Sequence, residues 1–247
     1  MAIISIFSGV YCHGEAIADA VCRRLGWDRI DDELLDLASG RSGVSADRLA
    51  SVMYGPPPFF NRLTREREKN LASLRCALAE LVQRDDLVCH GYAGLLLPRR
   101  IAHVLQVCAI ANTDYRIEVA RETGGLSRAE AQKAIVEEDA RRRRWTRWIL
   151  DRDPYAGNMY DVVLAMQDTT VDAAVDIVED SVHKPSVRTT DASRRAAADF
   201  LLAARVQQVL AARGYDVEAD AADGDVVIGI NKPVMRMGSL GRKLEAL

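Results

Sequence analysis

Two glycines near the start of the chain have the spacing of a loop that binds anions. Gly9 and Gly14 have four residues between them, and they lie between an apolar run at residues 3–7 and a helical pattern at residues 16–25. Backbone N–H groups of such a loop, with the N-terminus of the following helix, form a site for a phosphate group. A tight turn without a ligand is the alternative. The loop predicts phosphate binding by Gly9, Tyr11, Cys12, His13 and Gly14.

The two residues after Gly14 differ from those of a typical phosphate loop. The first of these positions normally supplies a cation to the β- and γ-phosphates, and the second supplies a hydroxyl to magnesium. This sequence has Glu15 and Ala16 there. A carboxylate repels a triphosphate, and alanine has no oxygen with which to bind the metal. We therefore expect Glu15 to lie at the phosphate site and the transfer chemistry of the loop to be altered.

The elements around this loop alternate between buried strands and helices. Apolar runs predict strands at residues 3–7, 27–30, 87–89, 104–110 and 161–165. Helical periodicity predicts helices at residues 16–25, 32–38, 70–84, 115–123, 127–150 and 171–182. Ser127 and Glu130 have the spacing of a capping box. This strand–helix–strand order implies a parallel sheet and an α/β fold.

Several short motifs follow one another along residues 1–182. They lie at residues 14–26, 30–35, 88–97, 115–122, 125–131 and 159–163. Their order and spacing resemble those of the cytidylate-kinase-like family, within the P-loop nucleoside monophosphate kinase superfamily. The resemblance implies that residues 1–184 form a P-loop NTPase three-layer fold with a parallel sheet.

The same resemblance implies a reaction and its cofactors. The reaction is ATP-dependent phosphoryl transfer to a nucleoside monophosphate, with CMP or dCMP as the acceptor, and it uses ATP and magnesium. In that family, lid arginines neutralise charge on the phosphoryl group that is transferred. The matching catalytic residues here are Arg141, Arg142 and Arg144. A solvated helix face, with these arginines paired to acidic residues 137–139, is the alternative.

Asp31 and His90 complete the nucleotide-binding site that the resemblance implies. Asp31 matches the acidic position after the second strand and would face a nucleoside or a metal-bound water; a helix N-cap is the alternative. His90 begins a His-Gly-Tyr segment where relatives have Gly-Arg-Gly. Together with Glu15, this change removes positive charge from the place where phosphates would lie. A catalytically impaired homologue with a regulatory or interaction role is therefore the alternative function.

The same tripeptide, Cys-His-Gly, follows two of the predicted strands. Those strands are neighbours in nucleotide-kinase sheets, so the two Cys-His pairs could converge at the same edge. Two cysteines and two histidines would suit zinc, whereas small buried core cysteines are the plainer alternative. The zinc ligands would be Cys12, His13, Cys89 and His90, and no other metal site is assigned.

Composition limits the classes of partner and the compartment. The net charge of −3 does not favour nucleic acid, and the expected ligand is a nucleotide or another phosphorylated small molecule. Five scattered cysteines indicate reduced thiols in the cytoplasm. The apolar start reads as a first strand rather than a signal peptide, and we expect no transmembrane segment.

A change of composition near residues 184–190 predicts a boundary, followed by a small α+β module at residues 190–247. The module consists of a helix at residues 192–213 and a hairpin of two strands, 215–221 and 225–230, joined at Asp223-Gly224. It faintly resembles a BON-type module, which would imply binding to lipid surfaces or to other proteins, such as a protein partner or a second copy in a homo-oligomer. A helix and hairpin that only pack on each other are the alternative.

Overall fold

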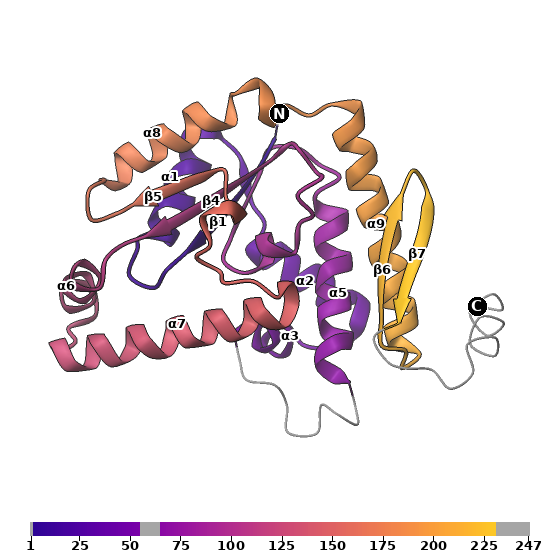
Figure 1. Ribbon diagram of the computed structural model, residues 1–247, viewed down its shortest axis with the longest axis horizontal. Coiled ribbons are helices and arrows are strands. Elements are labelled where there is room, and N and C mark those ends of the chain that lie inside the picture. The colour runs from indigo at the N-terminus through magenta and orange to yellow at the C-terminus, as the bar shows by residue number, and fades with distance from the viewer. Residues whose placement is uncertain (1, 55–64, 231–247) are drawn as a thin grey trace.

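A five-stranded parallel sheet forms the centre of the computed structural model, which describes residues 2–54 and 65–230 (Figure 1). The strand order is β2-β3-β1-β4-β5. The strands are β1 (Ile3–Ser8), β2 (Asp28–Arg29), β3 (Leu87–His90), β4 (Val104–Ile110) and β5 (Val162–Ala165). Every pairing in this sheet is parallel. Each strand therefore needs a crossover to reach its neighbour, and helices cover both faces.

Alternating side chains of β1 divide the core into two layers. Ile4 and Ile6 point to one face, where they pack with α1 (Gly14–Leu25) and α8 (Val171–Val182). Ile3 and Phe7 point to the other face, which is covered by α2 (Asp31–Ser42) and α5 (Glu66–Leu81). All four side chains are at most 1 % exposed. The predicted three-layer P-loop fold is confirmed.

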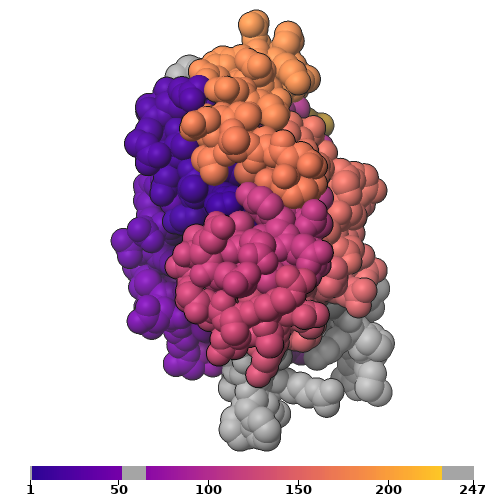
Figure 2. Space-filling model, turned by 90° about the vertical axis from the view of Figure 1, so that its left-hand side faces the viewer, coloured from indigo at the N-terminus to yellow at the C-terminus, as the bar shows by residue number. Residues whose placement is uncertain are grey.

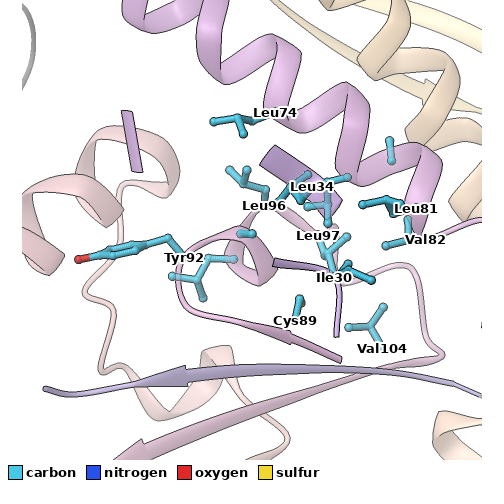
Figure 3. Close-up of a cluster of buried hydrophobic side chains, with 14 of the residues drawn as sticks. Ile30, Leu34, Leu74, Leu81, Val82, Cys89, Tyr92, Leu96, Leu97 and Val104 are labelled. Atoms are coloured by element: carbon cyan, nitrogen blue, oxygen red, sulfur yellow. The ribbon is translucent and has the colours of Figure 1, made fainter. Parts of the chain in front are cut away.

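The second of these layers is built mainly from leucines. Figure 3 shows Leu34 of α2, Leu74 of α5 and Leu96 of the 3-10 helix η1 (Ala93–Leu96) gathered above Cys89 and Val104 of the sheet. Such packing fixes α2 and η1 against the carboxyl end of β3. The site residues that follow β2 and β3 are thereby held on rigid elements.

Two helices border the carboxyl end of the sheet, α6 (Thr113–Gly124) and the long α7 (Arg128–Leu150). Ser127 and Glu130 cap α7 reciprocally, as predicted. Ile117 of α6 and Ile135 of α7 pack with Tyr11 of the glycine loop. Figure 2 shows α1, α6 and α8 side by side on one face of the molecule.

Some elements differ from the sequence prediction. Helix α3 (Ala46–Tyr54) was not predicted, although Ser45 directly before it and Asp47 in its first turn were available start signals. Strand β2 is shorter than residues 27–30, since it pairs only with β3 at the sheet edge and Ile30 already caps α2. The glycine-proline segment at residues 55–60, which the sequence marks as either a flap or a rigid turn, lies outside the described residues. Two further 3-10 helices, η2 (Gly157–Met159) and η3 (Pro185–Val187), lie in loops.

The C-terminal elements are α9 (Asp191–Ala212) and an antiparallel hairpin of β6 (Val217–Ala222) and β7 (Asp225–Ile230). Asp223 and Gly224 both have positive φ, as the predicted tight turn requires. Phe200 of α9 belongs to the same core as α5, and Ala203 packs with β6 on the other side. The BON-like resemblance is not confirmed. The division into residues 1–184 and 190–247 stays a prediction.

Within residues 2–54 and 65–230, no helix combines the length and the apolar character needed to cross a membrane.

Candidate functional site

The loop between β1 and α1 has the conformation of an anion cradle. Tyr11 and His13 adopt left-handed backbone angles, with φ of 61° and 56°, and α1 begins at Gly14. A Cβ at Gly14 would lie 2.8 Å from the His90 Nε2 atom and would also overlap Ser8. Only glycine fits there. The close approach leaves the first N–H groups of α1 at the carboxyl end of the sheet.

The side chains of the loop point away from the cradle. Tyr11 packs against α6 and α7, and Cys12 is 1 % exposed in the core beneath α1. The His13 Nε2 atom lies 3.1 Å from the hydroxyl of Tyr115. The side chains of these three predicted binding residues are therefore engaged in contacts within the protein.

Glu15 carries a fixed negative charge at the start of α1. Its carboxylate lies 2.8 Å from Arg29 Nη1 and 3.1 Å from His90 Nδ1. The hydrogen bond from Arg29 is the main reason why the pKa of Glu15 is lowered. The position that supplies a cation in a typical phosphate loop thus holds an ionised carboxylate.

Arg29, at the end of β2, is the centre of an acidic cluster. Besides Glu15, its guanidinium contacts Asp19 at 2.5 Å and Asp31 at 2.7 Å. These partners, Glu15 first, raise the pKa of Arg29 above its usual value. One guanidinium among three carboxylates leaves the cluster with a net negative charge. Sequence reasoning missed Arg29, although its place at the end of a strand next to β3 was the available signal.

His90 joins this cluster as a neutral group. Its Nε2 atom lies 3.3 Å from Ser8 Oγ, and burial lowers its pKa despite the nearby carboxylates. The backbone N–H of His90 donates to Asp31 Oδ1 at 2.8 Å. Asp31 is therefore occupied by Arg29 and by the β3 backbone. Ile30, not Asp31, is the N-cap of α2, so the N-cap alternative was wrong.

The three predicted lid arginines lie in different places. Arg142 Nε donates to the carbonyl of Ser8 at 3.1 Å, and its Nη1 atom pairs with Glu138 at 2.8 Å. Arg141 also pairs with Glu138. Arg144 is exposed, about 200° around α7 from Arg142. The ion pairs with Glu138 agree in part with the solvated-face alternative, but Arg142 is 14 % exposed and reaches the loop.

These side chains enclose a cavity of about 420 Å³. It lies beside the loop, between α1, α2, α5 and α7, and residues 9–14 are not part of its lining. Its charged and polar lining includes Ser8, Glu15, Arg29, Asp31, His90 and Arg142. The structure therefore brings together four of the predicted site residues, Glu15, Asp31, His90 and Arg142, and it adds Arg29.

A buried ion pair behind the loop was also missed by the sequence analysis. Arg116 of α6 donates from Nε to the Val10 carbonyl at 2.9 Å and makes two hydrogen bonds, of 2.9 and 2.8 Å, to Asp139 of α7. The Tyr155 hydroxyl donates to Asp139 at 2.9 Å. Burial opposes ionisation of Asp139, but its bonds with Arg116 outweigh burial and lower its pKa. The pair fixes the glycine loop to α7.

The donor atoms do not form a metal site. Across residues 2–54 and 65–230, no group of three or more His, Cys, Asp or Glu side chains is placed to hold a metal ion. Burial raises the pKa of Cys12 to about 11 and that of Cys89 to about 12, as expected of small core cysteines. The zinc alternative was therefore wrong. The residues around the loop do not fit magnesium either, because Ala16 has no hydroxyl and the carboxylate of Asp31 is already paired with Arg29.

A parallel sheet of this strand order, with a glycine cradle at the end of β1, defines a P-loop protein of the nucleotide-kinase type. The chain belongs to the cytidylate kinase-like family, whose model matches residues 3–168. No curated protein matches the chain significantly.

Several solved structures are similar to the chain over about three quarters of its length. One is an uncharacterized protein from Eubacterium ventriosum, with a TM-score of 0.54 and 13% identity over 74% of this chain and 98% of that one. Two are shikimate kinases. The enzyme from Bacteroides thetaiotaomicron has a TM-score of 0.44 and 12% identity, over 74% of this chain and 99% of that one. The enzyme from Acinetobacter baumannii, in complex with shikimate, has a TM-score of 0.38 and 11% identity, over 74% and 96%. At these identities the likeness concerns the fold alone.

Proposed function

We propose that the chain is a nucleotide-binding member of this family whose phosphoryl transfer, from ATP to a nucleoside monophosphate such as CMP or dCMP, is impaired. The observation that carries the proposal is the ionised Glu15, held by Arg29 and His90 where a phosphate loop normally presents a cation. The carboxylate at this position does not alter the backbone of the cradle, whose N–H groups are still available to an anion.

Retained binding is supported by the geometry of the loop. The left-handed residues Tyr11 and His13 and the tight approach at Gly14 give the backbone of a phosphate cradle, and the N-terminus of α1 adds its partial positive charge. Arg142, with its guanidinium at the Ser8 carbonyl, provides a cation beside the cradle. These groups need neither the missing lysine nor the missing hydroxyl in order to bind an anion.

Impairment is supported by electrostatics. A unit charge about 4 Å from a phosphate oxygen repels it by about 1 kcal/mol in water and about 4 kcal/mol near a protein surface. Glu15 is 66 % exposed, which places its effect toward the lower value. In addition, the chain lacks the attraction between the phosphates and the cation that a typical phosphate loop has at this position. Since each 1.4 kcal/mol or so is a factor of ten in rate, we expect transfer to be slower by at least about tenfold.

The experiment compares the natural chain with the double variant Glu15→Lys/Ala16→Thr. Calorimetry with ATP, CMP and dCMP, with and without magnesium, measures binding, and ADP formation measures transfer. We expect the natural chain to bind ATP with little CMP-dependent ADP formation, and the double variant to gain at least about tenfold in ADP formation. Glu122→Lys, an exposed residue at the end of α6, is the matched charge control and should change neither. Absence of ATP binding in the natural chain contradicts nucleotide binding; equal ADP formation in both chains contradicts impairment.

An active kinase is the second candidate, and Arg142 is the observation that favours it. If the natural chain forms ADP in a CMP-dependent way, Arg142→Ala should lower turnover while Arg144→Ala should not. The reason is that Arg142 contacts the end of β1, directly before the loop, and Arg144 is exposed on the opposite side of α7. Equal effects of the two substitutions would remove Arg142 from the catalytic role.

We further infer that the chain works in the cytoplasm with reduced thiols. All five cysteines are free, and Cys12, Cys76, Cys89 and Cys108 are buried. A binding role for the C-terminal module stays a prediction.

A further inference from the structure

An open cavity of about 790 Å³ lies where the end of α2 and helix α3 meet α5 and α9. Its lining shares no residue with the cavity beside the glycine loop. Gln208, Val209 and Ala212 of the lining belong to α9, beyond residues 3–168 that the family model matches. Membership of the family therefore does not explain this cavity, whose volume suits a small organic ligand.

One face of α5 forms a polar wall of the cavity. Glu66, Lys69, Asn70 and Ser73 are spaced by three and four residues, so they lie along the same side of the helix. Helix α5 lies beside both α3 and α9 (Figure 1). A helix face between two neighbouring helices is normally apolar. A polar face at this place favours a binding site.

Asn70 is a buried polar group of this wall whose hydrogen bonds are missing. The residue is 4% exposed, and its side-chain amide makes no hydrogen bond with any residue that the structure describes. The amide is not sealed in the interior, since Asn70 lines the cavity. Burial of an amide without a partner is unfavourable. A ligand in the cavity can accept a hydrogen bond from its NH₂ group.

Lys69 places an unmatched cation next to this amide. It is half-buried in the same wall. Within residues 2–54 and 65–230, Lys69 has no ion pair, and Glu66, one turn earlier on α5, is engaged by Arg48. An ammonium group is a point charge with three donors, which suits the oxygens of a phosphoryl group.

The charges of the lining do not balance. They are three cations and one carboxylate, Arg41, Arg48, Lys69 and Glu66. The neighbouring Glu80 pairs with Arg41 but also with Arg205, so it does not remove the excess. An excess of two positive charges matches a dianion better than a monoanion.

The rest of the wall is apolar. Val44 follows α2, and Val209 and Ala212 lie on α9. Val209 is exposed to solvent. Contact with the hydrocarbon part of a ligand would remove these side chains from water.

We propose that this cavity binds a small phosphomonoester with an apolar body. The phosphoryl oxygens accept hydrogen bonds from Lys69 Nζ and Asn70 Nδ2, and the apolar body contacts Val44 and Val209. The proposal uses none of the residues of the loop cavity and does not depend on nucleotide binding there.

The test measures binding of phenyl phosphate and benzoate to the full chain by calorimetry at about pH 7.5, where a phosphomonoester is close to a dianion. Benzoate has the same ring with a single charge. We expect phenyl phosphate to bind saturably and at least about fivefold more tightly than benzoate, because its second charge adds attraction. Saturating ATP should leave this binding unchanged.

Variants place the ligand in the cavity. Lys69→Met should weaken phenyl phosphate at least about tenfold, whereas Lys69→Arg keeps the charge and should retain most of the binding. Asn70→Leu should weaken it about threefold or more. Lys133→Met, at an exposed lysine of α7, is the matched control and should change nothing. Unfolding curves check that each variant is folded, and Asn70→Ser replaces Asn70→Leu if that variant is not.

Several results would overturn the proposal. They are absence of saturable binding, equal binding of phenyl phosphate and benzoate, and equal affinity of the natural chain and Lys69→Met. Binding that is lost with ATP and unaffected by Lys69→Met would place phenyl phosphate at the glycine loop instead. Absence of ATP binding contradicts the proposed function but leaves the Lys69→Met comparison decisive for this cavity.

Discussion

At the scale of single residues, both arginines of the candidate site are engaged by carboxylates before any ligand is present. Arg29 is engaged by Glu15, Asp19 and Asp31, and Arg142 is engaged by Glu138. A phosphate that enters must compete with these carboxylates for the same guanidinium groups. Binding through backbone N–H groups does not face this competition, which is why we assign the cradle, and not the side chains, the main role in binding.

His90 should make stability depend on pH. Burial lowers the pKa of its imidazole below the value of about 6.5 in an unfolded chain. The unfolded chain therefore takes up the proton first as pH falls below that value, and the folded state loses about 1.4 kcal/mol for each unit of difference, until pH passes the folded pKa. We expect the stability advantage of the natural chain over His90→Asn to shrink between pH 7.5 and 5. Urea unfolding of both chains at several pH values measures this difference in free energy of unfolding. A difference that stays constant with pH would contradict the prediction.

Arg116 should contribute strongly to stability. Its side chain is 8 % exposed and that of Asp139 is 15 % exposed, so Arg116→Met leaves a buried carboxylate without its cation. We expect a loss of about 3–5 kcal/mol in the free energy of unfolding. Arg121→Met, on the same helix, removes an ion pair with Glu118 that is half exposed and should cost less than about 1 kcal/mol. If the two variants lose similar free energies of unfolding in urea, the buried pair contributes no more to stability than the exposed pair.

At the scale of elements, the same glycine-to-alanine change should have opposite effects in two helices. At Gly14, the first residue of α1, the added Cβ would meet Ser8 and His90, so we expect a loss of about 1–3 kcal/mol in stability. At Gly40, in the exposed part of α2, nothing lies within 4 Å, so alanine should stabilise the chain by about 0.5–1 kcal/mol. Thermal unfolding of both variants measures the difference. Equal shifts would mean that Gly14 has room for a side chain.

The elements themselves could be read from the sequence far better than the contacts between them. The apolar run of β4 and the helical pattern of α8 predicted both elements to the residue, because burial leaves a local periodic pattern. The charge cluster at Arg29 and the Arg116–Asp139 pair were missed. Their partners come from different strands and helices, and ion pairs leave no periodic pattern in one segment. For Asp31, the local signal of a helix start was present, but the carboxylate is used by Arg29 and the His90 backbone instead.

At the scale of the whole molecule, α9 links the kinase-like sheet to the hairpin. One side of the helix packs on α5 and enters the main core, and the other side packs with β6. The composition change near residues 184–190 suggests a boundary, but a helix that shares a core with the preceding domain should unfold with it.

The substitution Phe200→Ala tests this coupling. Phe200 is fully buried in the core that also contains Trp145 of α7, and its truncation should cost about 3–5 kcal/mol. If the molecule unfolds as one unit, tryptophan fluorescence and far-ultraviolet circular dichroism will shift to lower urea together, with coincident midpoints. Val209→Ala, at a 49% exposed position of the same helix, is the control and should change stability by less than about 0.5 kcal/mol. A fluorescence midpoint that stays in place while part of the dichroism signal is lost would instead support an independent C-terminal module.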